Sequence, residues 1–191
     1  PVRSSPARSG PGSWSTLGAT NPQPRAAAGV AVVDDSVYIV GGCTNASCTD
    51  SNTTVKFEPA GEDFSTVAAY PHNVAWMSCG GIAGKAYCAG GVSASTFTDG
   101  FSYDPDSDAW TPIAAMPVDL WGSQEASANG LLVLAGGVAN NSAGLTNQTI
   151  AYDPAADAWL DLPDANFARA RDRRTVHQHA AIREGVQRFL S

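Results

Sequence analysis

The chain has 191 residues, 43% of them hydrophobic and only 15% charged, a composition typical of a folded domain or of several small repeats packed together. No apolar run approaches the roughly 20 residues that span a bilayer, so a transmembrane helix is not expected. Residues 14–165 contain 3 basic and 16 acidic side chains. A body this acidic repels phosphate backbones, so nucleic-acid binding is not expected either.

Residues 1–13 consist almost entirely of Pro, Ser, Gly and Arg. They carry too little apolar surface to offset the loss of chain entropy on folding, so we expect a disordered leader or linker.

From residue 14 onward the pattern predicts short β-strands. In the first unit two apolar strands, 28–33 and 36–40, flank the turn at Asp34-Asp35, and the second of them ends in Gly-Gly. A third strand (53–57) and a fourth (64–67) flank an acid-Pro turn, in which Pro pre-sets φ and the acid accepts a hydrogen bond from the backbone two residues on.

The same unit occurs three times, with Gly-Gly pairs that end at Gly42, Gly91 and Gly137. The later third strands are expected at 100–103 and 148–152, and the later fourth strands at 110–113 and 159–162. Aligning the Gly-Gly pairs places Ala83-Gly84 and Asn129-Gly130 at the hairpin turn, where Asn-Gly is a strong signal because both residues must adopt positive φ. Four antiparallel strands per unit make one blade of a β-propeller.

The combined signature, three apolar residues before Gly-Gly, then Tyr-Asp-Pro, then Trp, resembles the kelch repeat. Two of the three units match it closely, and the first has Phe57-Glu58-Pro59 and Phe64 instead. The resemblance implies an all-β fold, a partial kelch β-propeller over 14–165 with blades at about 14–67, 64–113 and 110–162. Because kelch propellers generally close with about five to seven blades, it also implies that the remaining blades belong to a longer parent chain.

The start of a fourth unit follows Trp159, but no further Gly-Gly appears. Residues 166–191 form an irregular basic tail, for which a weak helix and disorder are both open. Truncation or a reading-frame change would also explain the loss of the pattern.

The hairpin register of the second unit places Cys79 opposite Cys88 on a non-hydrogen-bonded pair, where Cα atoms lie about 4.5 Å apart. This spacing suits a disulfide, although the two could instead be small core residues in place of Val and Ile. Cys43 and Cys48, five residues apart, could close a small loop. Two locally bridgeable pairs favour an oxidising compartment, and we expect a secreted, extracellular protein.

The sequence contains no catalytic motif: no nucleophile elbow, no metalloprotease helix, no phosphate loop and no dinucleotide fingerprint. Only three histidines are present, His72, His177 and His179, so neither a metal site nor a cofactor is expected. Four glycosylation sequons occur in or beside the loops after Gly-Gly, where Ser, Thr and Asn enrichment produces them by chance.

The loops that follow each Gly-Gly and the connections between units are expected to share one face of the propeller, where length variation is concentrated and recognition is commonly placed. Aromatic side chains and a carboxylate on this face suit a protein, peptide or carbohydrate ligand. Packing between blades is the alternative role for the two tryptophans. The candidate binding residues are Tyr70, His72, Trp76, Phe97, Asp119 and Trp121.

The sequence therefore predicts a non-catalytic binding module from a larger secreted bacterial protein. The chain also resembles the kelch modules of large secreted bacterial subtilisin-like serine peptidases, which implies that any catalysis resides in a separate domain. Two alternatives remain: part of a propeller enzyme, such as a kelch oxidase or sugar epimerase, with its site in other blades, and an intracellular scaffold with reduced cysteines.

Overall fold

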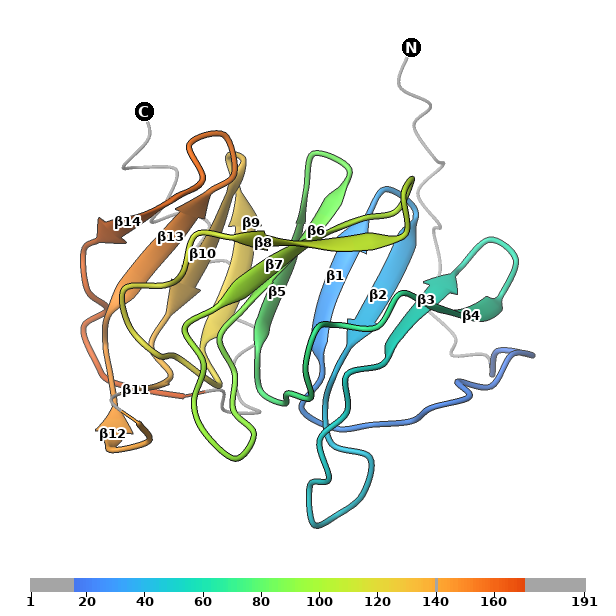
Figure 1. Cartoon of the computed structure of the whole chain (residues 1–191), viewed down its shortest axis with the longest axis horizontal. Coiled ribbons are helices and arrows are strands. Elements are labelled where there is room, and N and C mark those ends of the chain that lie inside the picture. Colours follow the sequence, from blue (N-terminus) through green and yellow to red (C-terminus); the bar gives the residue numbers. More distant parts are fainter. Residues whose placement is uncertain (1–15, 140, 171–191) are drawn as a thin grey trace, which may run out of the picture.

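The computed structural model describes residues 16–139 and 141–170, and within them every regular element is a β-strand. The predicted leader and nearly all of the predicted basic tail lie outside the described residues. Twelve of the described strands form three four-stranded antiparallel sheets (Figure 1). They are β1 (Gly29–Val33), β2 (Ser36–Val40), β3 (Thr54–Glu58) and β4 (Asp63–Val67); β5 (Ser78–Ile82), β6 (Lys85–Ala89), β7 (Gly100–Asp104) and β8 (Ala109–Ile113); and β9 (Gln124–Ala128), β10 (Leu131–Ala135), β13 (Thr149–Asp153) and β14 (Ala158–Leu162).

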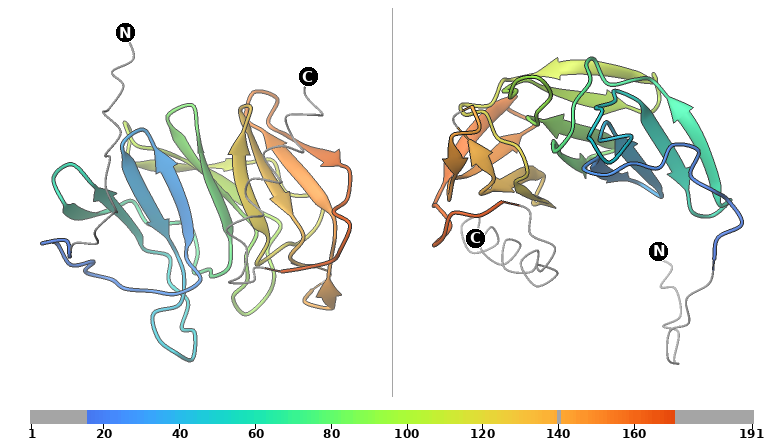
Figure 2. Two further views of the ribbon diagram at one scale, coloured as in Figure 1. Left: turned by 180° about the vertical axis from the view of Figure 1, so that it is seen from behind. Right: turned by 90° about the horizontal axis from the view of Figure 1, so that it is seen from below.

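In each sheet the strands pair in chain order, and the sheets stand side by side as an open arc (Figure 2). The first strands of the sheets, β1, β5 and β9, contact one another along the concave side of the arc, whereas the fourth strands lie on the convex side. A short pair, β11 (Val138–Ala139) and β12 (Gly144–Leu145), extends the loop between β10 and β13. The arrangement is that of consecutive propeller blades, as the repeat predicts.

The second glycine of each Gly-Gly pair is required by close packing. Gly42, Gly91 and Gly137 have φ of 91°, 98° and 109°, a region that L side chains rarely adopt. A Cβ at these positions would lie 2.6–2.9 Å from the backbone oxygens of Ala26, Ala75 and Trp121, respectively. The predicted hairpin turns are also confirmed, since Asn129 and Gly130 have φ of 50° and 78°.

Neighbouring sheets are joined by the aromatic residues and acids of the repeat. The carboxylate of Asp108 accepts hydrogen bonds from the hydroxyl of Tyr103 (2.7 Å) and from the backbone N–H of Ala68 in the preceding sheet (2.8 Å). The indole of Trp110 donates to the carbonyl of the same Ala68 (2.9 Å). The third sheet repeats this arrangement against Ala114, through Tyr152, Asp157 and Trp159.

The first sheet keeps only part of this arrangement. Glu62 occupies the position of Asp108 and accepts a hydrogen bond from the backbone N–H of Gly18 (2.9 Å), but Phe57 and Phe64 have no donor to add. Leu17 is exposed beside this junction, and Val30 and Val32 of β1 are 46% and 59% exposed. The corresponding positions in the second sheet, Cys79 and Gly81, pack against β1.

The predicted pairing of Cys79 with Cys88 is confirmed. The two residues face each other across β5 and β6 with Cα atoms 4.1 Å apart, and their disulfide is buried in the core between the first two sheets. A second disulfide joins Cys43 to Cys48 in the loop between β2 and β3. All four cysteines of the chain are thus paired.

The backbone hydrogen-bond pattern of the two earlier units continues past β14. Gly42 and Gly91 donate to the carbonyls of Val74 and Leu120, and Gly137 donates in the same way to Arg169 (2.6 Å). Ala165 likewise donates to Asn147, as Tyr70 does to Asn52 in the first unit. Residues 165–169 therefore take the path that leads into the next sheet in the two earlier units.

Candidate binding face

One end of the arc is formed by the long loops. The β2–β3, β6–β7 and β10–β13 loops and the β4–β5 and β8–β9 connections all lie at the lower end of Figure 1, whereas the tight hairpin turns lie at the upper end. We call this lower end the loop face. The residues that the sequence predicts for binding all belong to these loops and connections in the chain.

Hydrogen bonds accepted by aspartate carboxylates tie the successive loops of this face together. The hydroxyl of Ser93 in the β6–β7 loop donates to Asp50 in the β2–β3 loop. Asp119, in the β8–β9 connection, accepts from the hydroxyl of Thr96 (2.6 Å) and from the backbone N–H of Asn141 (2.6 Å). These contacts hold the loops in a defined arrangement, and pre-organisation of this kind lowers the entropic cost of binding.

Trp76 lies two residues before β5 and is 37% exposed. Its φ of 61° is matched by Ala27 (53°) and Gly122 (62°) at the same position of the other units. The three backbones form a chain of hydrogen bonds in which Trp76 donates to Ala27 and Gly122 donates to Trp76, each at 2.8 Å. Since the scaffold accepts Ala or Gly at this position, it does not require a large side chain with positive φ.

Trp121 is half-buried and lies beside Trp76, with ring centroids 6.2 Å apart and an angle of 62° between the ring planes. Its indole N–H donates to the hydroxyl of Ser142 (3.2 Å), and its backbone pairs with Val138 of β11. The two rings meet edge to face. At the position of Trp121 the other units have Ala26 and Ala75.

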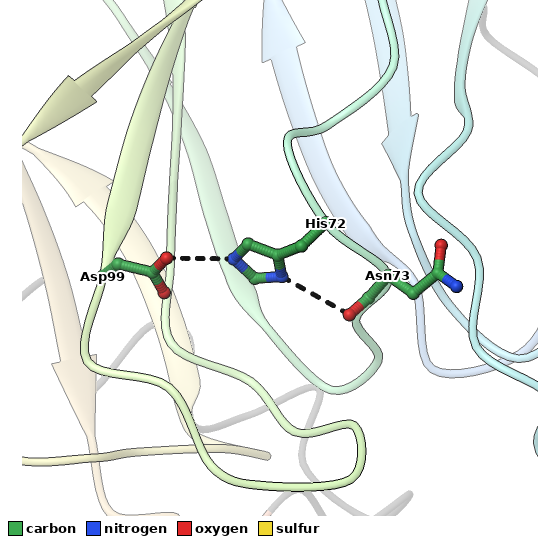
Figure 3. Close-up of polar contacts among 3 residues, drawn as sticks. All are labelled: His72, Asn73 and Asp99. Atoms are coloured by element: carbon green, nitrogen blue, oxygen red, sulfur yellow. Dashed lines mark hydrogen bonds and ion pairs between the residues drawn. The ribbon is translucent and has the colours of Figure 1, made fainter.

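His72 is held between two hydrogen-bond acceptors (Figure 3). Its Nε2 lies 3.0 Å from Oδ2 of Asp99, and its Nδ1 lies 3.3 Å from the backbone oxygen of Asn73. A neutral imidazole has one ring N–H, so each neutral tautomer donates to one of these two oxygens. The ring also packs on Phe97, with centroids 4.2 Å apart.

Tyr70 is a core residue rather than a surface residue, since it is only 1% exposed. Its ring makes edge contacts with His72, Phe101 and Trp110. Burial, with a smaller effect of Asp99, raises the pKa of the Tyr70 hydroxyl far above its usual range. Within the described residues this hydroxyl has no hydrogen-bond partner, and Oδ1 of Asp99 is also buried without one.

The structure thus divides the predicted binding residues into two groups. Trp76, Trp121 and Asp119 belong to one part of the loop face, and Tyr70, His72 and Phe97 pack together between the first two sheets. Sequence reasoning did not single out Asp99 or Ser142, because each is an ordinary polar loop residue whose partner is brought close only by the fold.

A metal site and a membrane-spanning helix are both absent from the part of the chain that the structure describes. No group of three or more His, Cys, Asp or Glu side chains is placed to hold a metal ion there. Likewise, none of its elements is a helix long and apolar enough to cross a membrane.

Comparisons with known proteins agree with the resemblance of the sequence repeat to the kelch motif. The family model of the kelch motif matches residues 24–68 and 77–117. The solved structure of YjhT is similar with a TM-score of 0.67, covering 78% of this chain and 53% of that chain, at 20% identity. The fold is a partial kelch β-propeller.

Among curated proteins, the Kelch repeat and BTB domain-containing protein 1 of cowpox virus (strain Brighton Red) is 29% identical over 153 residues, 76% of this chain and 26% of the viral protein. Alpha-scruin of Limulus polyphemus is 32% identical over 36% of this chain and 8% of its own length. The F-box/kelch-repeat protein At1g22040 of Arabidopsis thaliana is 32% identical over 48% of this chain and 20% of its length. The chain thus spans about a quarter or less of these relatives.

Proposed function

We propose that this kelch chain is a non-catalytic binding module whose protein, peptide or carbohydrate ligand docks on the loop face. The observation that carries the proposal is the pair Trp76 and Trp121, which leaves large aromatic surface accessible at positions where the other units have Ala or Gly. Large, rigid aromatic side chains supply much of the binding energy at protein surfaces. Kelch repeats in general mediate protein interactions, in agreement with this role.

The proposal is tested by presenting the purified chain to a displayed library of random peptides and to an array of neutral oligosaccharides. Ligands selected in this way are expected to lose at least about tenfold in affinity against Trp76→Ala, as is common for an interface aromatic residue. Leu160→Ala is the matched control, because Leu160 is an exposed apolar residue on β14, away from the loop face. Ligands that bind Trp76→Ala and wild type equally would place the binding surface elsewhere.

We propose further that additional blades complete the propeller on the exposed side of the first sheet. The hydrogen bond from Gly18 to Glu62 supports this, because it corresponds to the bonds from Ala68 to Asp108 and from Ala114 to Asp157 between neighbouring sheets. The exposed Val30 and Val32 support it as well, since their counterparts in the second sheet are packed on a neighbour.

We also propose an extracellular location in a larger bacterial protein, of which a serine peptidase domain could form another part. The pairing of all four cysteines is what supports an oxidising compartment. The peptidase connection rests on the sequence resemblance alone. Free thiols measured under denaturing conditions on protein isolated from its natural source would test the location, since free cysteines there would contradict it.

A further inference from the structure

We infer that residues 171–191 of this chain cover the outer face of the third sheet, the face on which a following blade would pack in a longer propeller. This end of the arc is opposite to the one where further blades are proposed above. Successive side chains of a strand point to opposite faces of its sheet. Leu132 and Leu134 of β10 pack toward the second sheet, so Leu131 and Val133 point to the outer face.

The outer face of the third sheet is apolar and buried. Leu131, Val133 and Ala151 are 7%, 0% and 0% exposed and form one hydrophobic cluster. Among the described residues, the partly buried hydrophobic side chains that pack against this cluster are Ala128 and Leu162, and both belong to the same sheet. At the other end of the arc, two valines on the outer side of the first sheet are 46% and 59% exposed. The third sheet therefore has a cover that the first sheet lacks within the described residues.

The side chains of this face differ from those of the two faces that pack on a following sheet. Tyr38 and Tyr87 lie at the same position of the first and second units, and each packs on a tyrosine of the following sheet, with ring centroids 5.3 and 5.7 Å apart. The third unit has Val133 at this position. Two residues earlier it has Leu131, where the other units have a serine and a lysine. The face is thus aliphatic and lacks the ring that meets a following blade.

A hydrogen-bond donor between blades is also missing beyond the third sheet. The residues that directly follow β4 and β8 are Ala68 and Ala114, and the backbone N–H of each donates to an aspartate of the following sheet. The residue that directly follows β14 is Pro163, which has no N–H. A following blade could not form this bond. The third outer face therefore suits a cover of a different kind.

Residues 171–191 meet the requirements for such a cover. The segment begins beside the third sheet, since a Cβ on Gly122 would lie 3.9 Å from the Cβ of Ala170. Ile182, Val186 and Phe189 have the spacing of one apolar face of a helix. A helix rises about 1.5 Å per residue, so the segment is long enough to cross a sheet of four five-residue strands. Its five arginines against two acidic residues also favour contact with an acidic body.

The accessibility of methyl groups in the whole chain tests whether the face is covered. A soluble gadolinium chelate is added to methyl-labelled protein, and the broadening of each NMR signal is measured. We expect strong broadening for Val30 and Val32, which are exposed, and little for Leu131 and Val133. If the Leu131 and Val133 signals broaden as much as that of Val32, the face is uncovered and the inference fails.

Two neighbouring substitutions test whether residues 171–191 are the cover. Val186→Lys places a charge on the apolar side of the segment, so the broadening of the outer-face methyl signals should rise at least about threefold. Gln187→Lys is the matched control, because it adds the same charge on another side of the helix and should leave the broadening unchanged. Equal broadening in the two variants would contradict the inference.

Contacts within the wild type identify the cover even if Val186→Lys does not fold. Nuclear Overhauser effects are expected between the ring of Phe189 and the methyl groups of Leu131 or Val133. In a mixture of isotope-labelled and unlabelled protein, filtered spectra separate contacts within one chain from contacts between chains. Contacts only between chains would overturn the inference in favour of a second copy. The absence of any contact between the outer face and residues 171–191 would overturn it as well.

Discussion

At the scale of single residues, the carboxylates of Asp108 and Asp157 connect neighbouring sheets. Each carboxylate accepts one hydrogen bond from a tyrosine hydroxyl of its own sheet. It accepts a second from a backbone N–H that directly follows the last strand of the preceding sheet. For Asp108 the N–H of Ala68 and then Tyr103 hold the pKa of the carboxyl below its usual value, and for Asp157 Tyr152 and then the N–H of Ala114 do the same. Hydrogen bonds to the charged form are the physical cause.

These lowered pKa values predict a loss of stability in acid. A carboxyl whose pKa is lower in the folded than in the unfolded protein stabilises the fold above the unfolded value, near 3.8, and loses this contribution as the pH falls through the folded value. The Tm of the wild type should therefore fall as the pH is lowered from about 5 to below 3.8, and Asp108→Asn with Asp157→Asn should flatten this dependence. Asp161→Asn, an exposed position on β14, is the control. If calorimetry shows that Tm falls in parallel with pH in the wild type, the double variant and Asp161→Asn, then Asp108 and Asp157 do not cause the loss of stability in acid.

At the scale of elements, the strands follow from local chemistry. Short apolar strands, the Asn-Gly turn of the third unit and the aligned Gly-Gly pairs predict the first hairpin of each unit, and the acid-Pro turn predicts the second. Asp104 and Asp153 accept from the backbone N–H two residues on, as expected of such turns. The register that pairs Cys79 with Cys88 follows from the same alignment. The core position of Tyr70 does not follow from local chemistry, because the tyrosine lies in the connection between β4 and β5 and its burial depends on Phe101 and Trp110 of the next sheet.

The two disulfides should differ in accessibility to reductant in the folded protein. Cys79 and Cys88 are almost completely buried, whereas Cys48 is partly exposed in a loop. Because a buried bond opens only when the structure around it opens, we expect Cys43–Cys48 to be reduced at least about tenfold faster. Alkylation during timed reduction, followed by peptide mapping, measures both rates, and equal rates would show that the second sheet does not protect its disulfide.

At the scale of the whole molecule, the repeat specifies the scaffold more fully than the ligand. The Gly-Gly and aromatic positions recur because each blade packs on its neighbours in the same way, and this makes the fold predictable. Trp76 and Trp121 are separated in the chain by four strands, β5 to β8, and Ser142, which accepts a hydrogen bond from Trp121, comes from a loop without a repeating pattern. Such loops have no local rule that fixes their conformation, so sequence alone indicates the face but not its geometry.

The most direct test of the account is the association state of the purified chain. Among residues 16–139 and 141–170 no sheet covers the exposed apolar side of the first sheet, so the wild type should self-associate as its concentration rises, as sheet faces without a partner commonly do. Val32→Lys should shift the chain toward monomer, because Val32 is 59% exposed on that side. Sedimentation equilibrium of both proteins gives the answer. A wild type that stays monomeric at all concentrations and unfolds in one cooperative transition would contradict the account of three blades belonging to a larger propeller.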